Sequence, residues 1–266
     1  MNVPPLPTLT EVKSAIDKFV ATEDWGRHRA LGTPQEFLTH VGSALGVLQR
    51  SFVLLVRPDV PDTSQRYYRL RIVEQPLNDG LISEYGPPPP AFAGYDRCSI
   101  AHHPVMYCSA NPATTFHETL CSRKESKPVL YGYLSEWKVR EGATVNITPF
   151  MFNELPENSD LRPLVKNVSK GLTDLLSEHY EQDQISGVVE TMKYLSNMFI
   201  ADNTRSISSF IAHSHLYANA PARPDMLLYP SIQIGLRRAN FAIHPNSLFK
   251  LEMTKAFCFE IRGFKH

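Results

Sequence analysis

The sequence lacks the features that would assign it to several large classes of protein. No apolar run approaches the roughly 20 residues that a membrane-spanning helix needs. The first residues, MNVPPLPTLTEVK, lack the basic start and the apolar core of a signal peptide. Lys plus Arg and Asp plus Glu balance at 27 each, so no net charge attracts the chain to nucleic acid or to anionic lipid. We therefore expect a cytoplasmic protein that binds neither membranes nor nucleic acid.

Cysteine and clustered histidine are also scarce. The 266 residues include 4 cysteines without a CxxC spacing, which argues against a disulfide framework and fits a reducing compartment. Histidines cluster at His102-His103 and at His213-Ser214-His215. Adjacent loop histidines are usually exposed, and alternate residues of a helix point to different faces, whereas zinc requires three or four convergent ligands. We expect no metal site.

The common signatures of nucleotide-binding and hydrolytic enzymes are absent too. The sequence has no GxGxxG after a strand, no GxxxxGK[ST], no HExxH and no GxSxG. Any catalytic site in this chain must therefore be built from other residues.

What the sequence does contain is an ordinary globular core, with 42% hydrophobic and 10% aromatic residues. Apolar residues recur every three to four positions over 9–20, and Thr33-Pro34-Gln35-Glu36 has the form of a capping box, so a helical pair is expected before residue 50. Residues 158–217 show the same helical periodicity. Segments rich in β-branched and aromatic residues predict strands at 51–56, 67–73, 105–110, 129–134, MLLYPS (226–231), FAIHP (241–245) and 249–261.

The helices gather at two places around a strand-rich remainder, which predicts an α+β fold rather than alternating βαβ units. We divide the chain into an N-terminal helical extension, residues 1–57, and a catalytic domain, residues 58–266, that carries a helical insert at 158–217. An irregular stretch at about 75–104 holds the sequence GPPPP, and its prolines favour an extended polyproline II path and exclude helix. Loops of this length in a compact domain are often functional.

A serine stands in an unusual position within MLLYPSIQIG. Ser231 follows a proline, which cannot donate to a strand ladder, at the end of an expected buried strand. Arg97 in GYDRCSI, Tyr107 in VMYCSA and Glu118 in the helix TTFHETL precede it along the chain. Each has an ordinary interpretation when considered singly: Arg97 as a surface charge, Tyr107 as core, Glu118 as an exposed helix position and Ser231 as a turn hydroxyl.

Considered together, this order of Arg, Glu and Ser, with a Tyr between the first two, resembles the RES domain family, which is named for those three residues. The surrounding sequence agrees with the family in the same order. The agreeing pieces are Tyr68-Arg69 on a strand, the GPPPP segment, Val105-Met106-Tyr107, the helix that delivers Glu118, and the Tyr-Pro-Ser that precedes a strand led by Asn240. The resemblance covers roughly residues 67–262 and leaves the N-terminal helices outside.

The resemblance implies a fold similar to that of ADP-ribosyltransferases. It also implies an activity that breaks the N-glycosidic bond between nicotinamide and ribose in NAD, either by hydrolysis or by transfer to phosphate. Many members of the family look like toxins that deplete NAD and are held in check by a helical antitoxin. NAD would then be a substrate rather than a cofactor. An antitoxin protein and a second copy of the chain, in a homodimer, are the candidate protein partners.

The chemistry of these residue types fits such a site. Arg97 or Arg69 would bind the diphosphate through two parallel hydrogen bonds from a planar guanidinium. The face of Tyr107 would stack on the cationic nicotinamide ring, which is worth roughly 0.5–2 kcal/mol. Glu118 would bond the ribose 2-hydroxyl and stabilise the positive charge that develops on the ribose ring.

Ser231 would orient the carboxylate, the nicotinamide amide or the ribose through its hydroxyl. The catalytic residues that the resemblance implies are Arg97, Glu118 and Ser231. The substrate-binding residues that it implies are Arg69, Tyr107 and Asn240.

Two other functions stay open at this point. The same Arg, Tyr and Glu would serve the transfer of ADP-ribose to a protein or a small molecule. A nucleotide-binding module that has lost catalysis is favoured by the turn at 96–104, where Asp96, Cys98 and Ser99 replace the Gly, aromatic residue and Asn usual in the family. Asp96 would neutralise the neighbouring Arg97 guanidinium and weaken its hold on phosphate.

Overall fold

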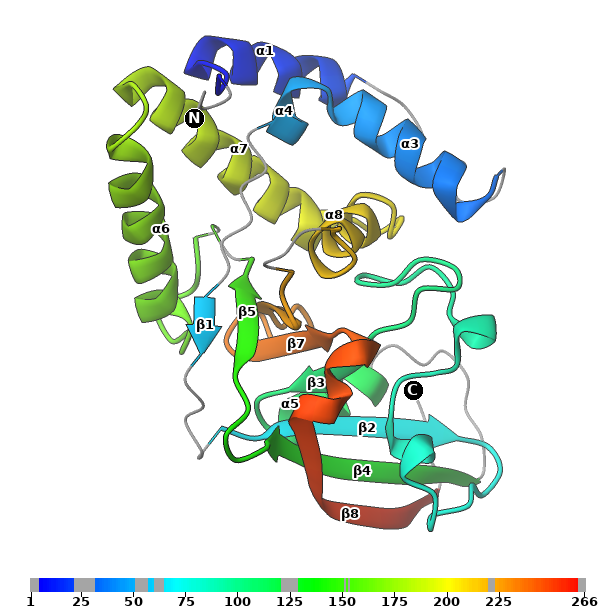
Figure 1. Ribbon diagram of the computed structural model, residues 1–266. Coiled ribbons are helices and arrows are strands. Elements are labelled where there is room, and N and C mark those ends of the chain that lie inside the picture. The colour runs from blue at the N-terminus through cyan, green and yellow to red at the C-terminus, as the bar shows by residue number, and fades with distance from the viewer. Residues whose placement is uncertain are drawn as a thin grey trace.

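The computed structural model describes residues 5–21, 32–50, 57–59, 65–120, 129–150, 152, 154–219 and 223–262 (Figure 1). Its α-helices are α1 (Leu9–Val20), α3 (Pro34–Leu45), α4 (Val47–Arg50), α5 (Pro112–Leu120), α6 (Arg162–Ser177), α7 (Gln182–Ala201) and α8 (Ile207–Leu216). Its strands are β1 (Arg57–Asp59), β2 (Tyr67–Val73), β3 (Met106–Ser109), β4 (Val129–Val139), β5 (Val145–Pro149), β6 (Met226–Pro230), β7 (Ala239–Ile243) and β8 (Leu251–Arg262). Short 3-10 helices are η1 (Ile82–Tyr85), η2 (Pro90–Phe92) and η3 (Pro245–Lys250).

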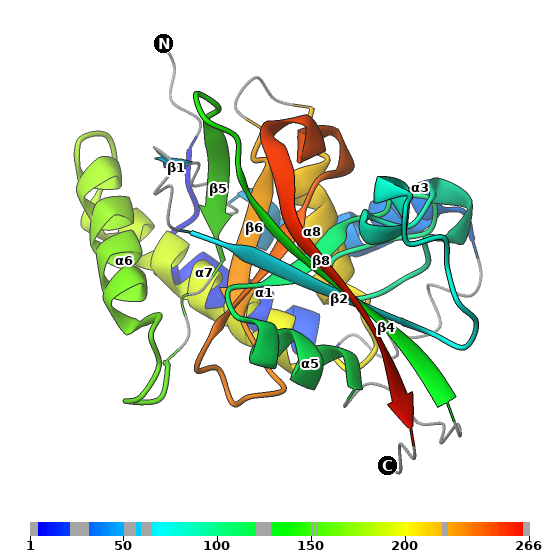
Figure 2. The same ribbon diagram turned by 90° about the horizontal axis from the view of Figure 1, so that it is seen from below.

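The described strands form one mixed sheet in the order β1-β5-β6-β7-β3-β2-β4-β8. Strands β5 and β6 are parallel, whereas the other neighbours pair antiparallel. Helices α1, α3, α4 and α7 gather at one end of the molecule, α6 runs along one side toward β1, and β2, β4 and β8 lie at the other end (Figure 1). Seen from below, β4 and β8 form a long twisted pair and α5 lies beside the strands (Figure 2). The fold is therefore α+β, as the sequence pattern predicts.

Buried apolar side chains form two clusters. The first joins both helical regions to one face of the sheet, and it includes Val12 of α1, Val41 of α3, Leu172 of α6, Met192 of α7 and Ala242 of β7. The second packs on the sheet and includes Tyr67, Met106, Trp137 and Phe241. The first cluster means that the N-terminal helices and the helical insert bury their apolar faces against each other and against the sheet.

The start of the chain lies directly against α7. The side-chain Nε2 of Gln184 donates to the carbonyl of Leu6 at 2.9 Å. A Cβ added to Gly187 would lie 2.6 Å from the carbonyl oxygen of Pro7, which is closer than real Cβ contacts allow. Glycine at position 187 therefore permits a backbone approach that another residue would prevent.

Most of the expected elements are present. The capping box at Thr33 is confirmed, because its side chain accepts from the Glu36 amide while the Glu36 carboxylate accepts from the Thr33 amide at 2.7 Å. The helical periodicity of 158–217 corresponds to α6, α7 and α8. The strands expected at 67–73 and 105–110 are β2 and β3, and the three expected near the C-terminus are β6, β7 and β8. The strand expected at 51–56 lies outside the described residues.

Some details differ from the expectation. The strand expected at 129–134 continues to Val139, because β8 pairs with β4 along its whole length. Strand β5 was not expected, since its five residues are too few to show a period. The prolines do not stay extended throughout: Pro89 is extended, but Pro90 begins η2, because the fixed φ of proline also suits the first position of a helix.

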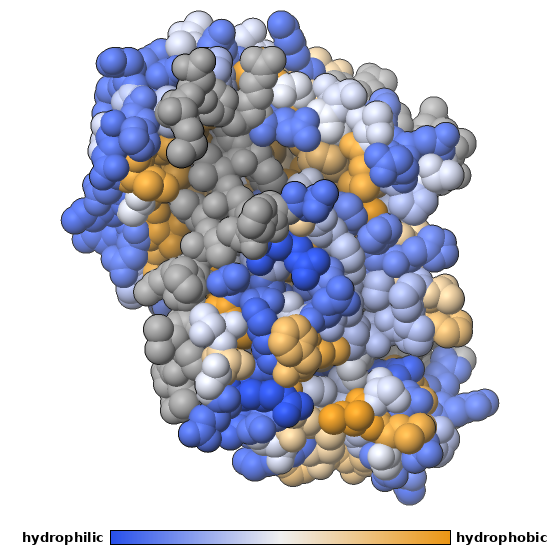
Figure 3. Space-filling view, viewed as in Figure 1, coloured by the Kyte–Doolittle hydropathy of each residue, from blue (hydrophilic) through white to orange (hydrophobic). Residues whose placement is uncertain are grey.

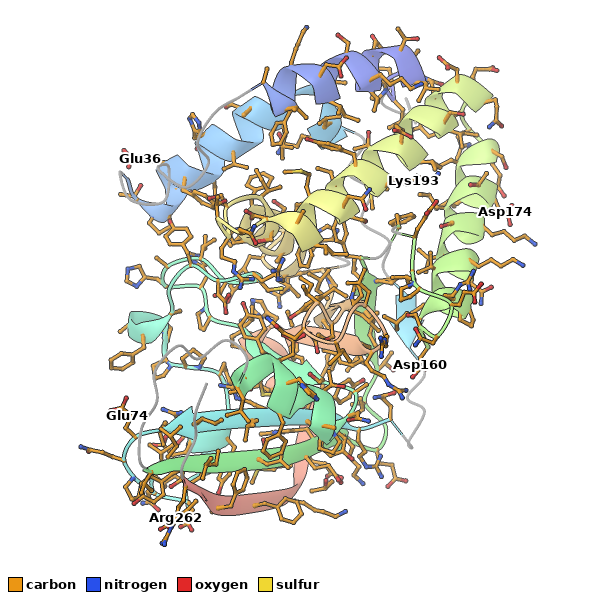
Figure 4. The ribbon with its side chains drawn as sticks, turned by 180° about the vertical axis from the view of Figure 1, so that it is seen from behind. Glu36, Glu74, Asp160, Asp174, Lys193 and Arg262 are labelled. Carbon is orange, nitrogen blue, oxygen red and sulfur yellow. The ribbon has the colours of Figure 1, made fainter. Side chains whose placement is uncertain are left out.

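The face shown in Figure 3 is predominantly hydrophilic, with apolar residues in small separate groups. Exposed charged side chains project outward from the helices and the sheet edge (Figure 4). They include Glu36, Glu74, Asp160, Asp174, Lys193 and Arg262. Among the described residues, no helix combines the length and the apolar character needed to cross a membrane.

Candidate functional site

A cavity of about 260 Å³ lies where β2, β3, α5 and β7 meet the turn at 96–97 and the loop between α7 and α8. Five of the six residues singled out from the sequence line it: Arg69, Arg97, Tyr107, Glu118 and Asn240. Their positions span the chain from 69 to 240, and the fold brings them to one place. The sixth, Ser231, is buried and hydrogen-bonded to one of the lining side chains.

Strand pairing sets the position of Asn240. It lies opposite Ser109 in the β3–β7 ladder and opposite Tyr229 in the β6–β7 ladder. Side chains of directly paired residues stand on the same face of a sheet, so these three share one face. Tyr107, two residues before Ser109, lies on that same face.

The Glu118 carboxylate is held by the sheet. Its Oε1 accepts a hydrogen bond from the Ser231 hydroxyl at 2.5 Å and another from Nδ2 of Asn240 at 2.7 Å. The Ser109 hydroxyl donates to Oδ1 of Asn240 at 2.6 Å, which fixes the orientation of the amide. Within the described part of the chain, Oε2 of Glu118 accepts no hydrogen bond. One oxygen of the carboxylate is thus fixed, and the other remains available to a ligand.

The corner after β6 explains the placement of Ser231. Strand β6 ends at Pro230, and the chain then closes a loop in which the Ser231 amide donates to the Arg238 carbonyl at 2.8 Å. The amide of Leu236 donates back to the Ser231 carbonyl, also at 2.8 Å. Both backbone groups of Ser231 are therefore bonded, and its side chain is left to reach Glu118.

Arg97 lines the cavity but is partly engaged elsewhere. Its Nη1 donates to the carbonyls of Phe199 and Ile200, at the C-terminal end of α7, and its guanidinium lies 5.8 Å from the centre of the Phe199 ring. Burial lowers the pKa of Arg97, and the nearby charge of Arg205 lowers it further. Arg97 thus fastens the 96–99 turn to the helical insert, which is a structural contact that the sequence did not predict.

The carboxylate of Asp96 is directed differently from the sequence expectation. Its Oδ1 accepts from the backbone amide of Arg97 at 2.8 Å. The same oxygen lies 3.7 Å from Nε of Arg205. Its ion pair is therefore with Arg205 and not with the Arg97 guanidinium, so Arg97 keeps its charge without a carboxylate partner among the described residues.

Arg69 is a half-buried cation, and its buried Nε–H is an unmatched donor among the described residues. Its Nη1 lies 3.4 Å from the Tyr107 carbonyl, which is a long hydrogen bond, and its Nε is buried without a hydrogen-bond partner among the described residues. Burial lowers the pKa of Arg69. A buried donor of this kind costs free energy unless an acceptor reaches it, so an anionic ligand at this wall would be favoured.

The hydroxyl of Tyr107 accepts from the backbone amide of Cys98 at 2.8 Å, which joins β3 to the 96–99 turn. Burial raises the pKa of Tyr107 well above its usual value, so the ring stays neutral. A neutral tyrosine fixed at its hydroxyl end presents a preorganised ring to the site.

Several lining residues were not singled out from the sequence, and Tyr229 and Arg205 are the two among them with the largest polar side chains. Tyr229 is part of the Tyr-Pro-Ser corner, and its position one strand away from Asn240 could have been suspected from that motif. Arg205 lies between two expected helices, in Asn-Thr-Arg-Ser, and nothing in the hydrophobic period marks it. Only the packing of the insert against the sheet brings Arg205 to the cavity.

A scan of protein-family models finds no match to this chain, and a search of curated protein sequences finds none either. What the cavity does is therefore inferred from its own geometry and chemistry.

Proposed function

We infer that this chain cleaves the N-glycosidic bond between nicotinamide and ribose in NAD, with water or phosphate as the acceptor. The single observation that carries the inference is the Glu118 carboxylate. One of its oxygens is fixed by Ser231 and Asn240, and the other has no partner in the described residues, at the wall of a cavity that also holds arginines and a tyrosine. This arrangement supports glycosidic cleavage, because a fixed carboxylate with a free oxygen can face the charge that develops on the ribose.

The reaction breaks the bond between C1′ of the ribose and the nicotinamide nitrogen. The bonding electron pair stays on nitrogen, which neutralises the pyridinium, and positive charge spreads over C1′ and the ring oxygen. Glu118, through Oε2, would accept the ribose 2′-hydroxyl proton in a hydrogen bond and lie close to that charge. Such a contact strengthens as the charge grows and therefore stabilises the transition state more than the substrate.

The acceptor, water or phosphate, forms the new bond at C1′ of the ribose. A water oxygen that bonds to C1′ releases one proton to solvent and yields ADP-ribose. A phosphate oxygen that bonds there yields ADP-ribose 1″-phosphate without water. Tyr107 would stack on the nicotinamide, and Arg69 would supply its unmatched N–H to the diphosphate.

Nicotinamide release from NAD by the purified protein, measured with and without phosphate, tests the proposal. We expect Glu118→Gln to keep the fold, because Gln has a similar helix propensity, and to lower nicotinamide release by at least about a hundredfold, the effect of losing one transition-state contact. Glu157→Gln, at an exposed position, is the matched control and should leave the rate unchanged. An unaltered rate in Glu118→Gln would remove this carboxylate from the mechanism.

A second function, nucleotide binding without turnover, is favoured by one observation. Nη1 of Arg97 is already bonded to two carbonyls of α7, so this guanidinium has less capacity for a diphosphate than a free one. Binding of NAD with no nicotinamide released would support this function. Label from NAD appearing on a protein or small molecule would instead indicate ADP-ribose transfer.

We also propose that the chain has an ADP-ribosyltransferase-like core and acts as a toxin. An ADP-ribosyltransferase-like core is supported by the mixed sheet and by a cavity at its centre. A toxin role predicts growth arrest when the native chain is expressed, no arrest with Glu118→Gln, and rescue by a co-expressed antitoxin protein. Growth that is equally slow with both chains would count against that role.

A further inference from the structure

Arg205 brings a positive charge from the helical insert to the cavity. It lies in the loop between α7 and α8, lines the cavity, and is about one-third exposed, with 33% of its side chain accessible. Its ion pair with Asp96, at 3.7 Å, is long, and the carboxylate of Asp96 is 56% exposed. A pair of this kind contributes little to stability, so the structural reason for an arginine here is weak.

The loop that carries Arg205 is held rigidly. The buried carboxylate of Asp202 accepts from the amide and hydroxyl of Thr204 at 2.9 and 2.6 Å. It also accepts from the amide and hydroxyl of Ser208 at 2.9 and 3.0 Å. Asp202 therefore occupies the amide of Ser208 in the first turn of α8, and any anion bound nearby must rely on side chains rather than on that amide.

The backbone of Arg205 is strained. Its φ is +62°, in the left-handed region that favours glycine. Arginine in this conformation is disfavoured relative to glycine, and such strain tends to concentrate at functional sites. Position 205 therefore carries an arginine although its backbone conformation favours glycine.

Three guanidinium groups surround the cavity, and their charges are incompletely matched. Arg97 and Arg205 are close enough that the charge of Arg205 lowers the pKa of Arg97, after the larger effect of burial. Arg69 lies on the β2 wall with its buried Nε unpartnered in the described residues. Of the two lining carboxylates, Glu118 is bonded to Ser231 and Asn240, and Asp96 is paired with Arg205. An anion between Arg97 and Arg205 would relieve their repulsion.

We propose that Arg205 binds phosphate oxygens of the ligand together with Arg97, and that the helical insert is therefore part of the substrate site. The identity of the ligand as a nucleotide rests on the proposed function, whereas the phosphate contact does not require that NAD is cleaved. A planar guanidinium presents paired donors to phosphate oxygens, which suits a diphosphate or an inorganic phosphate acceptor. Arg205 then sets affinity, while Glu118 sets the rate of cleavage.

Calorimetric titration of the full chain with ADP-ribose, pyrophosphate, inorganic phosphate and nicotinamide riboside tests the proposal. Arg205→Gly removes the guanidinium and relieves the positive φ, so the protein should unfold at the same temperature or higher. We expect its affinity for ADP-ribose and pyrophosphate to fall by about tenfold or more, the loss of a charge-assisted hydrogen bond. Nicotinamide riboside, which has no phosphate, should bind both proteins equally. If inorganic phosphate alone depends on Arg205, the phosphate bound there is the acceptor and not the diphosphate.

Two further variants separate charge from backbone effects. Arg205→Lys keeps the charge but loses the paired donors, so its affinity should lie between those of the native chain and Arg205→Gly. His102→Gly relieves the same kind of strain, a φ of +65°, at an exposed position outside the cavity, and should bind like the native chain. Equal affinity of Arg205→Gly and the native chain for every phosphate probe would overturn the proposal, as would native protein that binds none of them.

The same measurements, combined with an assay of nicotinamide release, distinguish a failure of the phosphate site from a failure of the proposed cleavage. Protein that binds ADP-ribose through Arg205 but releases no nicotinamide keeps the phosphate site and loses the enzyme. Protein that cleaves NAD with an unchanged KM in Arg205→Gly keeps the enzyme and loses the phosphate site.

Discussion

The two walls of the cavity are built in different ways. On one wall, the Glu118 carboxylate receives hydrogen bonds from Ser231 and Asn240, which are buried residues at the ends of paired strands. On the other wall, Arg97 of the 96–99 turn is bonded to the end of α7, and Arg205 of the helical insert is paired with Asp96 of that turn. The sheet wall is fixed by strand register. The insert wall depends on how well the helices stay packed.

From this difference we expect the two walls to have different roles in the proposed reaction. A carboxylate that must stabilise a developing charge gains from rigid support, because reorganisation would weaken its effect in the transition state. Guanidinium groups that bind phosphate tolerate more movement, because their long side chains can adjust to the anion. We therefore expect changes in the sheet wall to alter kcat and changes in the insert wall to alter affinity and stability.

The largest effect on stability should come from acid acting on the helical insert. His215 of α8 is fully buried, its Nδ1–H donates to the Ile211 carbonyl at 2.8 Å, and burial lowers its pKa from 6.5 to about 4. Below pH 6.5 the unfolded chain binds a proton at this residue that the folded chain does not, so the free energy of unfolding falls as pH falls from 6.5 to 4. The contribution is about 3 kcal/mol at most.

Denaturant unfolding of the native chain and of His215→Leu at several pH values measures this contribution. The slope between pH 6.5 and 4 should be smaller in His215→Leu, whereas His179→Leu, at an exposed position, should keep the native slope. Parallel curves for the native chain and His215→Leu would show that this imidazole does not carry the acid sensitivity.

The next effect concerns the sheet wall. Ser231→Ala removes one hydrogen bond to the Glu118 carboxylate, and bonds to charged groups are worth ~1.5–3 kcal/mol. We expect kcat for nicotinamide release to fall by about tenfold to a hundredfold with little change in KM, because Ser231 acts through Glu118 and not on the diphosphate. Steady-state kinetics with Ser177→Ala as the exposed control measure the difference. A raised KM with an unchanged kcat would place Ser231 among the binding residues instead.

The smallest effects compare two helical glycines of the insert. In Gly187→Ala, the new Cβ would meet the Pro7 carbonyl at 2.6 Å, so the N-terminal segment must shift, at a cost of about 1–3 kcal/mol. In Gly171→Ala, the new Cβ meets nothing within 4 Å, so the better helix propensity of alanine should stabilise by about 0.5–1 kcal/mol. Thermal unfolding of both variants measures the pair. A Gly187→Ala protein as stable as Gly171→Ala would show that the contact between α7 and the chain start is loose.

The same division explains how much could be predicted from the sequence. Ser231 and Asn240 lie beside local signals, a proline and a strand start, and Glu118 lies on a helix whose start is marked by Asn111-Pro112. These residues meet once the strands pair and α5 packs on β2. Arg205 and the bond from Arg97 to α7 depend on where the insert packs, and no local pattern carries that information. The direction of the Asp96 carboxylate was missed for the same reason, because its partner is more than a hundred residues away.

Because segments far apart in the sequence pair with each other, parts of the fold cannot form until late in synthesis. Leu6 meets its hydrogen-bond partner, Gln184, 178 residues further along the chain, and β4 finds β8 only when residues 251–262 exist. During synthesis, the apolar face of α1 stays uncovered until α7 has been made, and one edge of β4 stays unpaired until residues 251–262 have been made. A chain that stops after Asn240 but before Leu251 would carry every cavity residue and yet expose an unpaired edge of β4, so aggregation is its expected fate.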